Sequence, residues 1–323
     1  MKEITSIGMR TLSLLGERVS FGQALGELVA ANDKVIVITA DQTNAALYNF
    51  QKKHPDKLIN VGISEQNAIT VAAGLANEGY VPFVMFQAAF ASMRCADQVR
   101  VCMSYMKRNI KLVGIFSGFT FSDCGPTHYA LSDIALYRTF PNMAVVAPAD
   151  ATEVVKATHA AAFYDGPVYI RIGGSVNTPM VYRADYHFKI GEAVQVKDGR
   201  DICMFATGTM VYRALKVARC VENDTGLTVR VVNMHTLKPI DSQCIKNNLS
   251  FKLVVSLEEH STYGGLGGAI AEEMSLLRDR PPHMIVGARD MHVHAAEYEY
   301  LLGQHGLSVE DIANRIKNQI SDN

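Results

Sequence analysis

The residue in this sequence with the clearest chemical potential is Glu65, which stands in the segment GISEQN at positions 62–67. Residues 57–61 before it form an apolar run that is typical of a short buried strand. Residues 68–77 after it are apolar on almost every side and are followed by a glycine stop, which predicts a buried helix with Ser64 at its N-cap. A carboxylate in the first turn of such a helix gains from the helix dipole but loses its hydration. Glu65 is therefore either a functional acid or a capping or salt-bridged residue, and the local pattern leaves both interpretations open.

A second candidate is His128, which ends the segment DCGPTH in a glycine-containing loop at residues 117–128. A histidine in such a loop could act as a general acid or base, or it could bind a polar ligand. A lone histidine in a loop is, however, more often a surface residue. Ligands of doubly wound sheets bind at the carboxyl ends of the strands, so residues 41–44, 62–67 and 117–128 are the loops where we expect a site.

Other patterns in the sequence predict no cofactor or metal site of their own. The glycine run at residues 264–268 is out of register with a dinucleotide fingerprint, and we interpret it as a tight turn from a strand into a helix. The cysteines show no CxxC pair and no clustering of the kind that binds metal. We therefore predict free thiols in a reduced, cytoplasmic protein. The cysteines are Cys95, Cys102, Cys124, Cys203, Cys220 and Cys244.

Composition excludes several classes of partner. Of the 323 residues, 48% are apolar and 20% are charged, which is ordinary for a globular protein with ample core. The net charge of −1 gives no reason to expect a nucleic acid or an anionic membrane as a partner. No apolar run is long enough for a membrane span, and the first residues lack the apolar core of a signal peptide.

Strand-like and helix-like runs alternate along the chain, which predicts an α/β fold of two doubly wound domains with mainly parallel sheets. The strand-like runs are residues 34–41, 57–61, 80–86, 110–116, 143–147, 167–172, 201–206, 227–234, 252–257 and 283–286. The helix-like runs are residues 19–31, 68–77, 90–106, 131–139, 151–164, 212–222, 268–277 and 308–320. We expect an N-terminal arm (1–16) that is either loose or a short helix packed on a partner. We further expect a first domain (17–178), a polar linker (179–186) and a second domain (187–323).

Several motifs occur together in the order of one known family and cover nearly the whole chain from about Arg18 onward. They are GISEQN (62–67), AGLA (73–76), ADQVR (96–100), GPTH (125–128), MAVVAPAD (143–150), EEH (258–260) and GGLG (264–267). Through these motifs the chain resembles the transketolase family of thiamine-diphosphate enzymes. The resemblance covers the second half of a transketolase, its pyrimidine-binding domain and its C-terminal domain. The family's Gly-Asp-Gly segment, which helps to hold Mg²⁺ in the diphosphate-binding half, does not occur in this sequence.

The resemblance implies one subunit of a split enzyme. In the family the cofactor lies between a diphosphate-binding and a pyrimidine-binding domain, so this chain would supply the pyrimidine side and would be inactive alone. The implied partner is a transketolase N-terminal subunit that holds the diphosphate and Mg²⁺, with two chains of each kind in the complex. The implied activity is the transfer of a two-carbon ketol unit between small sugars by means of thiamine diphosphate.

The resemblance also implies roles for individual residues. Glu65 would share a proton with a ring nitrogen of the cofactor's aminopyrimidine, a task suited to a buried carboxyl group because burial favours its neutral, proton-donating form. Phe90 would stack on the pyrimidine ring, although an ordinary core phenylalanine remains an alternative. Gln87 and Ile63 would complete the cofactor-binding set. His128 would contact the sugar near its carbonyl and stabilise developing negative charge.

The positions that would bind the sugar depart from the family pattern. Cys124 replaces an aspartate that contacts a sugar hydroxyl, and we interpret it as a small filler or, less readily, as a reactive thiol. Phe116 and Gly174 replace a histidine and an arginine that often bind sugar phosphate, whereas the phosphate-binding Arg18 is kept. These losses remove cations that would compensate the desolvation of a phosphate. We therefore hypothesise a sugar substrate that is unphosphorylated, is branched or carries a different anion. Two alternatives would explain the same pattern: the correspondence between this sequence and the family motifs is wrong by one residue, or the partner chain supplies replacement cations.

Other functions remain open from the sequence. A deoxyxylulose-phosphate synthase resembles the chain around Glu65 but normally carries both halves in one chain. The β subunit of a 2-oxoacid dehydrogenase has the split architecture but lacks the GPTH segment. A non-catalytic interaction subunit derived from the fold is a third alternative, which the presence of Glu65, Phe90 and His128 disfavours.

Overall fold

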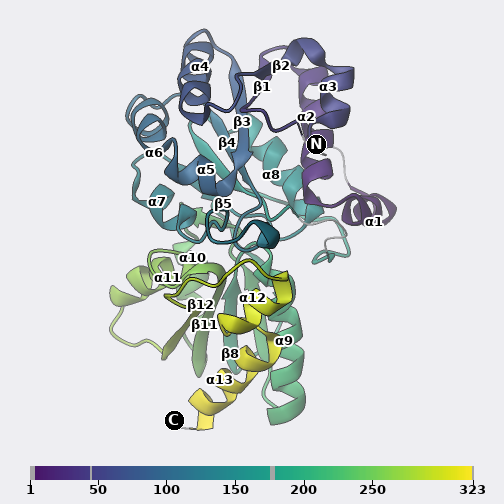
Figure 1. The fold of residues 1–323 in the computed structure, drawn as a ribbon. Coiled ribbons are helices and arrows are strands. Elements are labelled where there is room, and N and C mark those ends of the chain that lie inside the picture. Colours follow the sequence, from purple (N-terminus) through teal and green to yellow (C-terminus); the bar gives the residue numbers. More distant parts are fainter. Residues whose placement is uncertain (1–3, 44–45, 175–178, 322–323) are drawn as a thin grey trace.

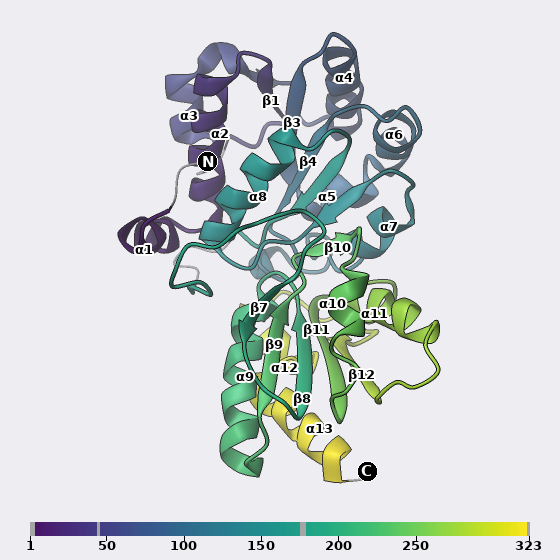
Figure 2. The same ribbon diagram turned by 180° about the vertical axis from the view of Figure 1, so that it is seen from behind.

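The computed structural model describes residues 4–43, 46–174 and 179–321. Asn44, in the first predicted ligand loop, and Thr178, near the predicted linker, lie outside the described residues. The chain forms two α/β lobes, an upper lobe built mainly from its first half and a lower lobe built from its second half (Figure 1; Figure 2 shows the reverse side). Among the described residues, no helix combines the length and the apolar character that a bilayer crossing requires.

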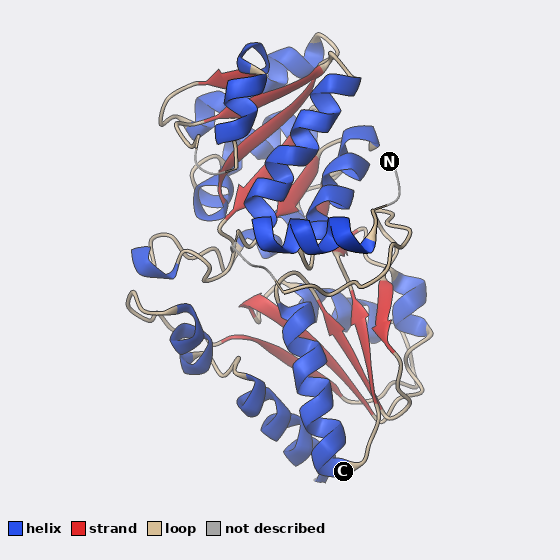
Figure 3. Ribbon diagram, turned by 90° about the vertical axis from the view of Figure 1, so that its right-hand side faces the viewer, coloured by secondary structure: helices blue, strands red, loops and turns tan. Residues whose placement is uncertain are grey.

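The upper lobe is organised on a seven-stranded sheet in the order β10-β5-β6-β4-β3-β1-β2. Every neighbouring pair in this sheet is parallel except β10 with β5. Its central strands are buried along their whole length because helices cover both faces (Figure 3). The strands are β1 (Val35–Thr39), β2 (Leu58–Asn60), β3 (Val81–Gln87), β4 (Lys111–Ile115), β5 (Ala144–Val146), β6 (Val168–Arg171) and β10 (Thr236–Lys238).

The helices of the upper lobe follow the strands as βα units. They are α1 (Ser6–Leu15), α2 (Glu17–Ala31), α3 (Tyr48–Lys53), α4 (Glu65–Asn77), α5 (Ala88–Met93), α6 (Ala96–Gln98), α7 (Asp133–Thr139) and α8 (Ala151–Phe163), with short segments η1 (Pro55–Lys57), η2 (Val99–Tyr105) and η3 (Ser122–Cys124). The predicted N-terminal arm contains α1, which packs on α2 and α8 of its own chain and buries Met9 and Leu12. Ile7 and Leu14 on the same helix are 76% and 68% exposed.

The lower lobe is built on a five-stranded sheet in the order β12-β11-β8-β9-β7, in which β7 alone is antiparallel to its neighbour. Its strands are β7 (Val194–Lys197), β8 (Ile202–Ala206), β9 (Val229–Asn233), β11 (Leu253–Ser261) and β12 (His283–Ala288). Its helices are α9 (Met210–Thr225), α10 (Ser242–Lys246), α11 (Leu266–Ser275), α12 (Tyr298–Gln304) and α13 (Val309–Ser321). Together the two sheets confirm the predicted α/β fold with mainly parallel sheets.

Two expectations about helices are wrong. The continuous helix predicted at residues 90–106 is broken after α5 and continues as the π-helical turns of η2. The apolar spacing of the sequence continues through the break, so periodicity does not reveal it. At the break, Arg94 donates a hydrogen bond to Glu65, and the Cys95 thiol donates one to the Ala91 carbonyl. Helix α4 is not buried on all sides, because the sheet covers one face and leaves Leu75 only partly buried on another.

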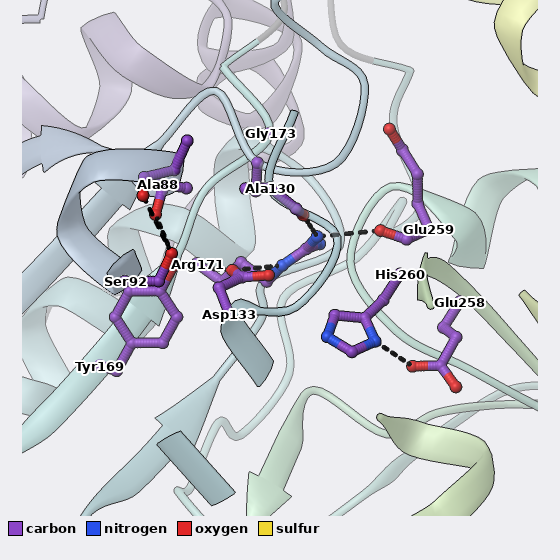
Figure 4. Close-up of polar contacts among 12 residues, drawn as sticks. Ala88, Ser92, Ala130, Asp133, Tyr169, Arg171, Gly173, Glu258, Glu259 and His260 are labelled. Carbon is purple, nitrogen blue, oxygen red and sulfur yellow. Dashed lines mark hydrogen bonds and ion pairs between the residues drawn. The ribbon is translucent and has the colours of Figure 1, made fainter. Parts of the chain in front are cut away.

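The glycine run at residues 264–268 forms the predicted strand-to-helix turn between β11 and α11. Glu258 accepts hydrogen bonds from the backbone N–H groups of Leu266 and Gly267, at 2.7 and 2.8 Å, and so fixes the first turn of α11. His260 lies 3.6 Å from the same carboxylate (Figure 4). These contacts assign the glycine run and Glu258 a structural task.

Buried polar groups join the two lobes. Strand β10 belongs to the second half of the chain but completes the upper sheet. The irregular segment at residues 179–186 is tied to the upper lobe, because Tyr182 and Tyr186 both donate hydrogen bonds to the buried Glu153. Asn233 of β9 also donates to Glu153, at 2.8 and 2.9 Å. The lobes therefore share one polar network.

The junction includes a buried histidine with a predictable acid sensitivity. His235 is fully buried and stacks on Phe188, and burial lowers the pKa of His235 from 6.5 to about 4. Between these pH values the unfolded chain binds a proton that the folded chain does not, so folding stability is lost as the pH falls through this window, by about 3 kcal/mol. We expect urea unfolding of His235→Gln to lack this part of the acid sensitivity. The exposed His292→Gln should behave like the parent protein, and equal losses in the parent and His235→Gln would contradict the prediction.

Candidate functional site

The candidate residues gather at the carboxyl edge of the upper sheet. Glu65 follows β2, and Gln87 and Phe90 lie at the end of β3 and in the helix directly after it. Phe116 follows β4, and Gly174 follows β6. Because these strands are parallel, their carboxyl ends meet at one edge, which is where ligands of such sheets bind.

Glu65 begins α4, and its side chain is 1% exposed. Its Oε1 accepts a hydrogen bond from Arg94 Nη1 at 2.8 Å, whereas its Oε2 is buried and has no partner among the described residues. Ser64 holds the N-cap position, as predicted, but its hydroxyl donates to the Val61 carbonyl at 2.8 Å and does not cap the helix. A buried acceptor without a donor costs about 1–3 kcal/mol, so Oε2 is a favourable place for a donor on a ligand.

Phe90 shares its Arg94 contact with this carboxylate and is only partly buried, unlike an ordinary core phenylalanine. The guanidinium carbon of Arg94 lies 4.1 Å from the centre of its ring, and the ring of His128 packs edge-on at 5.2 Å. Gln87 Oε1 is also buried without a partner among the described residues. Ile63 is 76% exposed and precedes the helix that carries Glu65.

The contacts continue from His128 to the predicted sugar-binding positions. Its ring meets that of Phe121 edge-on at 5.6 Å, and Phe121 stacks on Phe116 at 4.5 Å. The guanidinium of Arg18 lies 4.4 Å from the centre of the Phe116 ring, and Arg18 Nε donates to the Gly174 carbonyl at 2.7 Å. One unbroken series of contacts therefore runs from the buried carboxylate of α4 to the end of β6.

The backbone at position 174 favours glycine. Gly174 has a φ of +93°, a region that L side chains rarely adopt. A Cβ at this position would also lie 3.3 Å from the Phe116 backbone nitrogen and 3.3 Å from Arg18 Cδ. A larger side chain at this position would thus be strained and crowded.

The loop that carries His128 is held by the lower lobe. Glu259, which is 1% exposed, accepts hydrogen bonds from the Phe119 backbone N–H at 2.6 Å, from the Thr209 hydroxyl at 2.5 Å and from the Tyr298 hydroxyl at 2.6 Å. A side chain at Gly118, where φ is +62°, would collide with this carboxylate. The loop is therefore positioned by a residue that is distant in the sequence.

The same loop places His128 and Cys124 differently. His128 is partly buried, and its Nδ1 lies 2.9 Å from the Thr127 hydroxyl. Cys124 is exposed, and its backbone N–H donates to the Phe121 carbonyl at 3.2 Å. Both residues are thus at least partly accessible to solvent, in contrast to the fully buried Phe119.

A buried carboxyl group lies behind the end of β6. Glu17 Oε2 accepts a hydrogen bond from the Gly174 backbone N–H at 2.6 Å. Burial raises the pKa of Glu17 from 4.5 to about 7, against the opposing effect of this hydrogen bond. Glu17 therefore changes its charge near neutral pH. It contacts the backbone N–H of Gly174, whose carbonyl accepts the hydrogen bond from Arg18.

Comparison with known proteins decides the family. The transketolase pyrimidine binding domain matches residues 17–175, and the transketolase C-terminal domain matches residues 191–312. The chain belongs to the transketolase family. This transketolase chain is also 32% identical over 302 residues to one of the subunits of the apulose-4-phosphate transketolase of Phocaeicola vulgatus, an alignment that spans 93% of this chain and 96% of that protein.

Two further similar proteins are also named as a transketolase subunit or a split transketolase. The 6-deoxy-6-sulfo-D-fructose transketolase subunit SqwH of Clostridium sp. strain MSTE9 is 35% identical, over 91% of each chain. A solved structure of a split gene transketolase, in the form of an inactive beta4 tetramer, superposes with a TM-score of 0.85 at 35% identity. It covers 95% of this chain and 98% of that chain.

The site fits the pyrimidine side of thiamine diphosphate, the cofactor that the family's pyrimidine-binding domain implies. Two buried oxygens, Glu65 Oε2 and Gln87 Oε1, have no donor among the described residues. Arg94 contacts both Glu65 and the partly buried ring of Phe90, and Gln87 lies three positions before Phe90. An aromatic ring that carries N–H groups would satisfy such a set. Within the described residues, no group of three or more His, Cys, Asp or Glu side chains is arranged to hold a metal ion.

Three residues of the site were not found by sequence reasoning. Arg94 stands four positions after Phe90, a spacing at which helical side chains meet, so this signal was present in the sequence. Phe121 lay in a loop without periodicity. Glu259 reaches the loop of His128 across the lobe junction, and no local pattern predicts such a contact.

Proposed function

We propose that the chain is the pyrimidine-binding subunit of a thiamine-diphosphate-dependent transketolase that transfers a two-carbon ketol unit between sugars. The observation that carries this proposal is the buried Oε2 of Glu65, which has no partner among the described residues, on a carboxylate that Arg94 joins to the partly buried ring of Phe90. The relatives named as transketolase subunits support it, because this chain spans nearly their whole length.

Each residue of the site has a task in this proposal. The chemistry that thiamine diphosphate supplies when bound is a nucleophilic carbon for addition to a sugar carbonyl. Glu65 holds a proton between its Oε2 and a ring nitrogen of the cofactor, Phe90 provides a flat apolar surface, and Gln87 and Ile63 border the ring. His128 orients the sugar oxygen on which negative charge develops.

The assembly follows from the division of the cofactor site. We propose that a second chain, the N-terminal transketolase subunit, holds the diphosphate and Mg²⁺, and that two chains of each kind form the complex. The inactive tetramer of the related split transketolase supports self-association and inactivity without the partner. Exposed apolar side chains near α1, α4 and η2 support it too, because such surfaces are commonly covered; they are Ile7, Leu14, Ile63, Met93, Tyr105 and Met106.

The sugar-binding end of the pocket supports an unusual substrate. Phe116 and Phe121 stack on each other at the position where we expect the family's phosphate-binding histidine, and the positive φ of Gly174 disfavours a side chain where we expect its arginine. Arg18 remains as a cation. The names of the apulose-4-phosphate and 6-deoxy-6-sulfo-D-fructose transketolases describe a sugar phosphate and a sulfonated sugar, so related chains serve sugars outside the common set.

Reconstitution tests the proposal. The chain alone should give no ketol transfer, and addition of the diphosphate-binding subunit, thiamine diphosphate and Mg²⁺ should produce it. In the same complex, xylulose 5-phosphate with ribose 5-phosphate should be poorer substrates than unphosphorylated, branched or sulfonated sugars. Full activity of the single chain would contradict the split-subunit proposal, and ordinary transketolase efficiency with the two pentose phosphates would contradict the unusual substrate.

A further inference from the structure

Arg94 has no task in the proposed function, although it touches both groups that would meet the cofactor's ring. Its Nη1 donates to Glu65 Oε1 at 2.8 Å, and its guanidinium carbon lies 4.1 Å from the centre of the Phe90 ring. The Arg94 side chain is 44% exposed, whereas that of Glu65 is 1% exposed. The cation is therefore partly exposed to solvent and at the same time contacts a buried carboxylate.

We propose that Arg94 is a positioning residue for thiamine diphosphate: it holds the Glu65 side chain through Oε1 and leaves Oε2 for a ring nitrogen of the cofactor. This inference rests on the proposed function and deepens it. The two oxygens of Glu65 have different surroundings, one with a charged donor and one with no donor among the described residues. Arg94 thereby selects which oxygen is left for the ligand.

The physical basis is the charge of the pair. A guanidinium at hydrogen-bond distance from a carboxyl oxygen makes a strong, directional contact, which fixes the orientation of that side chain. The Cys95 thiol also interacts with Glu65, but burial raises the pKa of Cys95 to about 12, so the thiol stays neutral. Arg94 is therefore the charged group that holds Glu65 Oε1.

A competing explanation makes the opposite prediction. The guanidinium lies over Phe90 and against Glu65, which are the two places that the cofactor's ring would occupy. If Arg94 only fills an empty pocket, it has to leave before the cofactor binds, and its removal would strengthen binding. If Arg94 positions Glu65, its removal weakens binding.

Calorimetric titration of thiamine diphosphate into the complex with the diphosphate-binding subunit and Mg²⁺ separates the two. We expect Arg94→Ala to weaken binding by about ten- to a hundred-fold, the usual range for a hydrogen bond to a charged group. Arg94→Lys should recover part of the affinity, and added methylguanidinium should restore binding to Arg94→Ala. Arg230→Ala, which removes a guanidinium paired with Asp198 in the lower lobe, should bind like the parent.

The double variant shows whether the effect passes through Glu65. In the Glu65→Ala background, which offers Arg94 no side-chain oxygen to hold, Arg94→Ala should cause no further loss, and this double variant leaves no unpaired buried charge to disturb folding. Tighter or unchanged binding by Arg94→Ala, or an equal loss in the Glu65→Ala background, would overturn the inference. If the parent complex bound no thiamine diphosphate, the proposed function would fail as well; if only Arg94→Ala departed from expectation, the proposed function would stand.

Discussion

Glu65→Gln is expected to lower the rate of ketol transfer by the reconstituted complex by about 10²–10⁴-fold, the usual contribution of a positioned acid or base. The amide has the shape of the carboxyl group and can still accept a hydrogen bond from Arg94, which binds Oε1 at 2.8 Å in the parent. It cannot exchange a proton with the cofactor's ring nitrogen. The measurement is the initial rate at saturating thiamine diphosphate and Mg²⁺, with assembly of the complex checked by gel filtration.

A matched control lies on the same helix. Glu78 is exposed and caps the other end of α4, so Glu78→Gln makes the same chemical change far from the pocket and should leave the rate within a small factor of the parent. If Glu65→Gln assembled normally and kept most of the parent's rate, the chain would be an interaction subunit without a catalytic task, and the proposed function would have to be given up.

Arg171→Met is expected to lower the free energy of unfolding by about 3–5 kcal/mol, because it leaves the buried Asp133 without its cation. Arg171 Nε donates to Asp133 Oδ2 at 2.8 Å, and both side chains are nearly inaccessible (Figure 4). Arg171 Nη2 also donates to the carbonyls of Ala130 and Glu259, at 3.0 and 2.9 Å. One side chain thus ties β6 to α7, to the loop that carries His128 and to the lower lobe.

Two further variants make this measurement specific. Arg171→Met with Asp133→Leu removes both charges and should recover a large part of the lost stability, because apolar groups can replace a buried ion pair. Lys252→Met breaks the pair with Asp201, in which the lysine is 63% exposed, and should change stability by no more than about 1 kcal/mol. A urea denaturation series in which Arg171→Met lost no more than Lys252→Met would refute the expected role of the buried pair.

The strands of both sheets were predictable because parallel strands covered on two faces are continuous apolar runs, as at residues 34–41 and 201–206. The short elements were not. β7 and β10 extend the sheets at their edges, and α3, α10 and α12 are brief, so neither length nor periodicity distinguishes them from loops. The break in the helix predicted at residues 90–106 was not predictable either. At the break, Arg94 contacts Glu65, which is distant in the sequence, and the Cys95 thiol contacts the Ala91 carbonyl.

For the site, residue types and loop positions could be read directly. Glu65, Phe90 and His128 follow strands whose carboxyl ends must meet if the sheet is parallel, so their proximity was implied by the fold class. Their protonation and orientation were not implied, because these depend on partners elsewhere in the chain. Arg94 reaches Glu65 across 29 positions, and Glu259 reaches the loop of His128 across 140 positions.

The sequence by itself determined the family, the α/β architecture and the buried carboxylate at position 65, because short motifs and local periodicity are enough to predict them. Only the tertiary structure decided that one oxygen of this carboxylate is held by a cation while the other lacks a donor among the described residues. It also decided that the backbone at Gly174 adopts a φ of +93° in close contact with Phe116 and Arg18, which disfavours a larger side chain. The physical reason is the same in both cases: hydrogen bonding, burial and steric contact depend on distances between groups that lie far apart along the chain.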